Sequence, residues 1–268
     1  MRVASSQVRR GVSTGELTFI LFLVLAGLAC AGWMVYRQTV RTAPLPTALA
    51  AITQPDVAEA ARSYVRKNKP TALTGDLVEL LAQPDSFHVK SEEHPLVGKQ
   101  APDFTCPDHL GRPWSLAQAL RRGPVIVVFY YGYHCDHCVS QLFDLSEDAG
   151  YFQQLGAEIV ALSPDALATT QDRFAQYGTF AFPVLQDKDY AVAERYGCAW
   201  KVPASGEYEQ KHGCFVVAPS GQIVWANTGD EPFTGNRTLL YELHRLRAGE
   251  SGTTPPSAPK PPATTPAP

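Results

Sequence analysis

The chain has 268 residues, which is enough for one or two domains. Its formal net charge of -3 and its 18% of charged residues give no electrostatic argument for a nucleic-acid partner or an acidic substrate. Six cysteines in a chain of this length are too few for a scaffold built on disulfides, so we expect a hydrophobic core of ordinary size.

The N-terminal segment predicts a membrane anchor. Residues 1–16 are polar, and residues 17–36 form an uncharged, mostly apolar run. A helix of about 20 residues covers about 30 Å, the hydrocarbon thickness of a bilayer. The run is flanked by Arg2, Arg9 and Arg10 before it and by Arg37 and Arg41 after it. This distribution favours a cytoplasmic N-terminus and a single-pass protein whose main part is extracytoplasmic, that is, periplasmic. A cleaved signal peptide is the alternative, although its apolar region is usually only about 7 to 15 residues long.

Two further regions lack the pattern of a compact domain. Residues 37–94 are rich in Ala and Pro and show weak helical periodicity, with short helices expected at 56–67 and 76–82. We interpret 37–94 as a spacer between the membrane and the globular part, and docking on the globular part is the alternative. Residues 250–268 are rich in Pro and cannot bury a core, so a disordered tail is expected.

Residues 95–249 predict a compact α/β domain. The expected strands are 125–131, 158–163, 182–185, 214–218 and 223–228, and the expected helices are 116–120, 136–145, 164–177, 189–196 and 238–247. The last two strands flank a turn at 219–222 and should form a hairpin. The order of these elements predicts one mixed sheet with helices on both faces, a three-layer α/β/α architecture.

Cys135 and Cys138 stand at the turn between the first buried strand and the following helix. Unpaired N–H groups and the positive end of the helix dipole favour a thiolate there, and the spacing lets the two sulfurs close as a disulfide. A structural zinc site usually needs a second cysteine pair, which the other four cysteines do not supply at similar spacing. The pattern therefore predicts redox catalysis by Cys135 and Cys138. His134 and His137 could stabilise a thiolate when protonated, or could be solvated turn residues.

Five stretches of this domain match a known family. They are Leu96–Phe104, Gly156–Asp165, Phe182–Asp187, Ala191–Gly197 and Phe215–Gly221. With them the chain resembles the alkyl hydroperoxide reductase and thiol-specific antioxidant family, the peroxiredoxin-like proteins of thioredoxin fold. In that family's pattern Cys138 falls on the cysteine that attacks peroxide, while Tyr131 and Cys135 stand in place of its proline and threonine.

The Cys135–Cys138 pair is also similar to the dithiol of thioredoxin-type oxidoreductases. That resemblance implies that Cys135 attacks a disulfide and that Cys138 resolves the mixed disulfide. It also implies that the loop before Phe215 faces the pair and brings His212 and Cys214 close to it. We therefore expect a membrane-anchored thiol:disulfide oxidoreductase that acts on protein disulfides or thiols and needs no cofactor.

Two alternatives remain open. The first is a thiol peroxidase that reduces peroxides with Cys138 as the attacking residue and Cys135 as the resolving one. The second is a copper-binding chaperone of thioredoxin fold, with Cys135, Cys138, His212 and Cys214 as soft ligands. The simpler interpretation of Cys214 is a small buried strand residue. Cys106 and Cys198 could pair in an oxidising compartment, but no sequence argument sets their distance.

Overall fold

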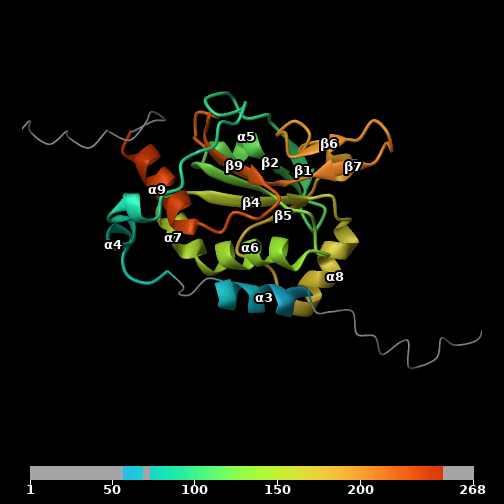
Figure 1. Ribbon diagram of the computed structural model, residues 1–268, viewed down its shortest axis with the longest axis horizontal. Coiled ribbons are helices and arrows are strands. Elements are labelled where there is room, and N and C mark those ends of the chain that lie inside the picture. Colours follow the sequence, from blue (N-terminus) through green and yellow to red (C-terminus); the bar gives the residue numbers. More distant parts are fainter. Residues whose placement is uncertain (1–56, 69–72, 250–268) are drawn as a thin grey trace, which may run out of the picture. The chain divides into compact units, whose positions relative to one another are not determined.

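The computed structural model describes residues 57–68 and 73–249 (Figure 1). The expected anchor at 17–36 and the expected tail at 250–268 lie outside these residues. Within the described ranges, none of the helices has both the length and the apolar character that a membrane crossing requires.

The domain is built on a 5-stranded sheet with the order β5-β4-β3-β8-β9. Its strands are β3 (Val125–Phe129), β4 (Glu158–Ser163), β5 (Val184–Gln186), β8 (His212–Val217) and β9 (Ile223–Gly229). β3, β4 and β5 are parallel, whereas β8 is antiparallel to both β3 and β9. The mixed sheet and its terminal hairpin are thus confirmed. Every residue of β3 is buried, as expected for a central strand covered on both faces.

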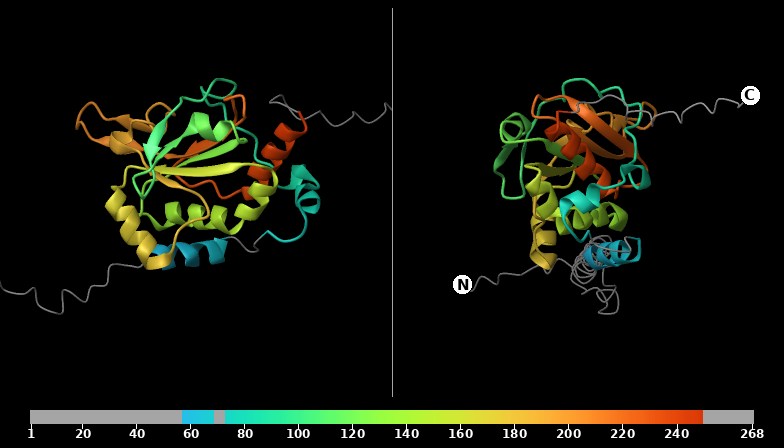
Figure 2. Two further views of the ribbon diagram at one scale, coloured as in Figure 1. Left: turned by 180° about the vertical axis from the view of Figure 1, so that it is seen from behind. Right: turned by 90° about the vertical axis from the view of Figure 1, so that its left-hand side faces the viewer.

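Helices cover one face of the sheet, and shorter segments cover the other (Figures 1 and 2). The helices are α6 (Asp136–Glu147), α7 (Ala149–Gln154), α8 (Leu167–Tyr177) and α9 (Asn236–Arg247). Because side chains alternate along a strand, Ile126 and Val128 of β3 pack in the core that contains Leu142 of α6 and Leu239 of α9. The second core lies on the opposite face and contains Val127 and Leu116, which begins α5 (Leu116–Leu120).

Much of the described part of the predicted spacer packs on the domain. α3 (Val57–Asn68) lies along the outer side of α6, away from the sheet, and its Ala58 and Ala61 are buried (Figures 1 and 2). α4 (Leu77–Leu81) begins at the cap Asp76, and the guanidinium of Arg237 donates to the Leu80 carbonyl. After a short 3-10 helix (Pro84–Ser86), Glu92 donates its backbone N–H to Ala226 of β9. The described residues of the 37–94 segment therefore dock on the globular part, as in the alternative to a free spacer.

The prediction of an α-helix at 189–196 is wrong. The chain forms a 3-10 helix (Lys188–Tyr190) and then successive turns, with φ of 56° at Asp189 and 57° at Tyr190. The buried Asp187 carboxylate accepts the N–H groups of Val192 and Ala193, each at 2.8 Å. This local bonding competes with a regular helix, as is typical of aspartate side chains.

Besides the 3-10 helix Pro84–Ser86, three elements or pairs were not predicted. They are α7, the pair β1 (Thr105–Pro107) with β2 (Pro113–Ser115), and the pair β6 (Ala199–Lys201) with β7 (Tyr208–Gln210). Strands of 3 residues are too short to show periodicity.

Candidate redox site

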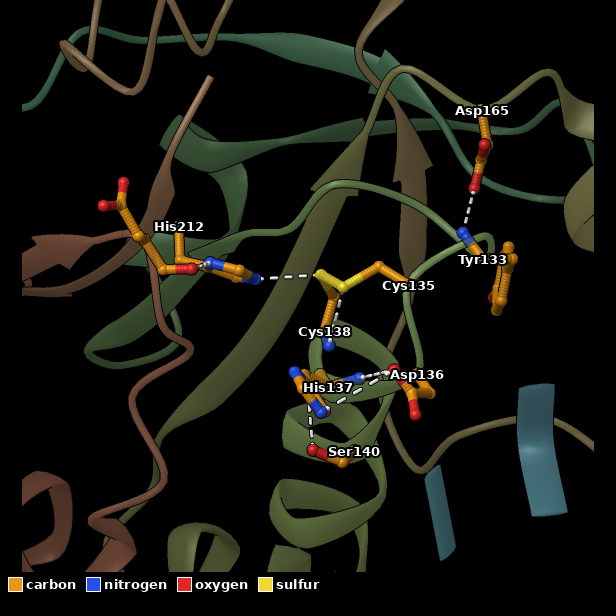
Figure 3. The surroundings of a disulfide bond; sticks show 9 residues. Tyr133, Cys135, Asp136, His137, Cys138, Ser140, Asp165 and His212 are labelled. Atoms are coloured by element: carbon orange, nitrogen blue, oxygen red, sulfur yellow. Dashed lines mark hydrogen bonds and ion pairs between the residues drawn. A yellow bond between two sulfur atoms is a disulfide. The ribbon is translucent and has the colours of Figure 1, made fainter. Parts of the chain in front are cut away.

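The turn between β3 and α6 is held from the neighbouring strand. Gly132 has φ of 113°, and a Cβ there would lie 2.8 Å from both carboxylate oxygens of Asp165, which follows β4. Oδ2 of Asp165 accepts the backbone N–H of Tyr133 at 2.8 Å (Figure 3). Glycine is therefore needed for two reasons, its left-handed backbone and its lack of a side chain. Burial raises the pKa of Asp165, opposed by the Tyr133 hydrogen bond.

Cys135 and Cys138 form a disulfide at the start of α6, with their Cα atoms 5.3 Å apart. Cys135 is the N-cap of the helix, and its Sγ accepts the N–H of Cys138 at 3.3 Å. Cys135 is partly exposed, whereas Cys138 is fully buried. An incoming substrate can thus reach Cys135, and an N–H group together with the helix dipole favours negative charge on that sulfur.

His212, the first residue of β8, faces the disulfide from the neighbouring strand (Figure 3). Its Nε2 lies 2.9 Å from the Sγ of Cys138, and its Nδ1 lies 3.0 Å from the backbone oxygen of Asp230. Because a carbonyl oxygen only accepts, we assign the ring proton to Nδ1, which leaves the lone pair of a neutral Nε2 directed at the sulfur. The ring is buried and stacks on Tyr131 at 4.3 Å between centroids.

The charge state of His212 is set by opposing effects. Burial lowers its pKa, while the carbonyl of Asp230 and the carboxylate of Glu231 act to raise it. Since burial is the largest effect, the pKa of His212 lies below its ordinary value, which favours the neutral imidazole. A neutral ring beside a reduced thiol can accept that thiol's proton.

The histidine before the motif and the histidine inside it lie at the surface. His134 is exposed. The His137 side chain is 47% exposed, its ring packs on Tyr64 of α3 at 4.5 Å, and its Nε2 is 3.9 Å from an oxygen of Asp136. The described contacts of His137 therefore run to α3 and to its own helix.

Three side chains could hold a metal ion when the disulfide is reduced. Within the described part of the chain, the ligand atoms of Cys135, Cys138 and His212 lie within 4.8 Å of one another. Cys214 is not in this group. It is 1% exposed on β8, paired with Val128 of β3, and burial strongly raises its pKa.

The remaining described cysteines are buried and unlinked. Cys106 and Cys198 are both free thiols, so the hypothesised bridge between them is not formed. Burial raises the pKa of Cys106 to about 11 and that of Cys198 to about 12. A side chain at Gly213 would collide with the sulfur of Cys198, which thus lies on the face of β8 opposite to His212.

Two features of the site were missed by sequence reasoning. The Asp230 contact is made by a backbone oxygen, which carries no side-chain signal. Asp165 had been assigned to the start of a helix, but it precedes α8 and anchors the turn instead. The Gly132 that it contacts was the available signal for a tight backbone approach.

Comparison with known proteins places these residues in a family context. Residues 97–226 match the model of the AhpC/TSA family. A Mycobacterium tuberculosis protein named as a peroxiredoxin is 37% identical over 134 residues, which is 48% of this chain and 82% of the relative. The thiol-disulfide oxidoreductase ResA of Bacillus cereus is 26% identical over 144 residues, 54% of this chain and 76% of ResA. The crystal structure of peroxidoxin BcpB from M. tuberculosis superposes with a TM-score of 0.50 at 25% identity and covers 60% of this chain and 98% of that one.

Proposed function

The chain belongs to the AhpC/TSA family and is a thiol-dependent oxidoreductase of thioredoxin-like fold, and on this basis we propose that it catalyses thiol–disulfide exchange through Cys135 and Cys138. One observation carries the proposal. The two sulfurs are bonded to each other at the start of α6, and one is accessible while the other is buried. That asymmetry suits an attacking and a resolving cysteine.

The reaction starts from the reduced pair. The Cys135 thiolate attacks one sulfur of a substrate disulfide, so a mixed disulfide forms and the other substrate sulfur leaves as a thiolate that takes up a proton. Cys138 then gives its proton to Nε2 of His212 and attacks the Cys135 sulfur. The mixed disulfide breaks, the Cys135–Cys138 disulfide forms, and the second substrate thiolate leaves and is protonated. The substrate disulfide gains two electrons, and the protein dithiol loses them.

The substrate class is protein disulfides or thiols, handled on the extracytoplasmic side of a membrane. The apolar run at 17–36 and the arginines around it support a single-pass anchor. Disulfides persist in an oxidising compartment, so the proposed location would give an exchange enzyme its substrates.

Trapping the mixed disulfide tests the roles of the two cysteines. Cys138→Ser should accumulate a covalent complex with a disulfide-containing protein, because no resolving thiol remains. Cys135→Ser should accumulate none, since the remaining sulfur is buried. Cys214→Ser is the matched control, a buried cysteine outside the pair, and should behave as the wild type. A complex formed by Cys135→Ser and not by Cys138→Ser would assign the attack to Cys138.

Peroxide reduction is the competing activity, favoured by the relative named as a peroxiredoxin and by the likeness to peroxidoxin BcpB. In this case Cys138 would attack the peroxide and Cys135 would resolve. The burial of Cys138 and the cover of its sulfur by His212 weigh against ready access. Single-turnover peroxide consumption separates the two activities. Peroxide consumption that is lost in Cys138→Ser but survives in Cys135→Ser would establish the peroxidase activity.

Metal handling is favoured by one observation, the cluster of Cys135, Cys138 and His212. Two thiolates and an imidazole suit copper(I) or zinc. Retention of one equivalent of copper(I) by the reduced protein, lost in His212→Ala, would support it. A protein that keeps no metal through purification at neutral pH would count against it.

A further inference from the structure

A loop between β9 and α9 connects the redox helix to His212. It spans residues 230–235, and two of its backbone oxygens accept hydrogen bonds from different elements. The backbone oxygen of Asp230 accepts from Nδ1 of His212 on β8, at 3.0 Å. The backbone oxygen of Phe233 accepts from Nε2 of Gln141 on α6, at 2.8 Å. Gln141 stands three residues after Cys138, so it lies one helical turn further along the same side of α6.

Stability alone does not explain a glutamine at this position. Gln141 is 1% exposed, and its side-chain oxygen finds no hydrogen-bond donor among the described residues. A buried, unpaired amide oxygen is unfavourable, and a leucine or methionine of similar size would avoid it. What the amide supplies, and an apolar side chain cannot, is the hydrogen bond to the loop.

Two further contacts hold this part of the chain. The centroids of the Phe233 ring and the Trp225 ring lie 4.8 Å apart, and Trp225 is a fully buried residue of β9. At the start of α9, Asn236 donates to the backbone oxygen of Asp144 on α6 at 3.1 Å. The loop is therefore held at both sides of its path. The pairing of Gly229 with His212 in the β8–β9 ladder fixes where it begins, and the bonds of Phe233 and Asn236 to α6 fix its course after Asp230.

We propose that Gln141 is a positioning residue that, by holding this loop, keeps the Asp230 carbonyl on Nδ1 of His212 and so directs the Nε2 lone pair at Cys138. The first part of the proposal, the orientation of the His212 ring, is a property of the folded protein and does not depend on any reaction. The consequence for the chemistry rests on the proposed function, in which Nε2 takes the proton of Cys138. Gln141 itself does not touch the reacting sulfurs.

Nitrogen-15 NMR of the His212 ring in the oxidised, full-length protein tests the first part. The wild type should show one tautomer with the proton on Nδ1, and Gln141→Leu should show a mixture of both. Ser140→Ala is the matched control, because Ser140 is also buried on α6 but bonds to its own helix through the His137 oxygen. A single Nδ1–H tautomer in Gln141→Leu would overturn the proposal. Gln141→Met, of closer shape, serves if the leucine variant does not fold.

A double-mutant cycle on the reduction equilibrium of the pair tests the second part. His212→Ala should shift the equilibrium about tenfold toward the disulfide, equal to about 30 mV, because the reduced Cys138 loses its proton acceptor. Gln141→Leu should shift it in the same direction about threefold. Gln141→Leu should have no further effect in the His212→Ala background. Full additivity, or an unchanged equilibrium in Gln141→Leu, would refute a role through His212. If Gln141→Leu changes the His212 tautomer but the wild type shows no exchange activity, the proposed function alone is refuted and the ring-orienting role of Gln141 stands.

Discussion

At the scale of single residues, the two sulfurs of the site differ in their surroundings. Cys135 caps the helix at the surface, whereas Cys138 is buried beneath it with the His212 ring against its sulfur. The residue spacing indicates that Cys138 points further inward than Cys135, since Cys138 shares a helix face with Leu142 and Leu145, and all three are buried. The orientation of His212 could not be predicted, because it depends on a backbone carbonyl.

The reactivity of the thiols should follow their exposure, so that the surface cysteine reacts and the buried ones do not. In the reduced, folded protein at pH 8, an alkylating reagent should modify Cys135 and leave Cys106 and Cys198 intact. Burial raises the pKa of Cys106 to about 11, so about one thiol in a thousand is ionised at pH 8, and fewer still at Cys198 with a pKa of about 12. Peptide mapping by mass spectrometry measures this, with unfolded protein as the control in which all three react. Equal rates at Cys198 and Cys135 in the folded protein would contradict it.

At the scale of elements, the turn from β3 to α6 is the part on which the site depends most. Gly132→Ala should lower the free energy of unfolding by about 1 to 3 kcal/mol, because a positive φ and a close carboxylate both oppose a Cβ. Gly150→Ala in α7 is the matched control. Apart from its chain neighbours and the backbone of its own helix, no heavy atom lies within 4 Å of the added Cβ, and alanine favours a helix over glycine by about 0.5 to 1 kcal/mol.

Urea unfolding of both variants measures these changes. Both substitutions replace glycine by alanine, but the changes in the free energy of unfolding should have opposite signs. A Gly132→Ala protein as stable as the wild type would show that the turn tolerates a side chain, and the account of how Cys135 is placed would then fail.

Elements were predicted well where the periodicity was long and uninterrupted. β4 and α6 follow their apolar patterns, since each has a full face to bury. The segment at 189–196 has helix-forming residues, but the buried Asp187 carboxylate bonds to its N–H groups and two residues take positive φ. A side chain that competes for backbone donors cannot be recognised from propensity alone.

At the scale of the whole molecule, the family was recognisable because five separate stretches of the domain matched it in order. The packing of α3 and α4 was not predictable, because short helices with weak periodicity do not reveal the surface that they cover. Docking of α3 along α6 gives the redox helix a second supporting layer on the side away from the sheet.

The proposed topology can be measured on intact cells that express the full chain. After mild reduction, a thiol reagent that cannot cross membranes should label Cys135, because the domain is proposed to face outward from the cytoplasm. The extent of labelling should match that in lysed cells. If Cys135 is labelled only after lysis, the domain lies on the cytoplasmic side. The proposed topology, with an anchor at 17–36 and the domain outside the cytoplasm, would then be wrong.

The most direct test of the central claim is the stoichiometry of a single exchange reaction. Reduced protein is mixed with a disulfide-containing protein, and the thiols released are counted beside the Cys135–Cys138 disulfide formed. We predict two substrate thiols for each new protein disulfide, and no release from Cys135→Ser. Release that persists in Cys135→Ser, or an absence of release from the wild type, would contradict thiol–disulfide exchange at this site.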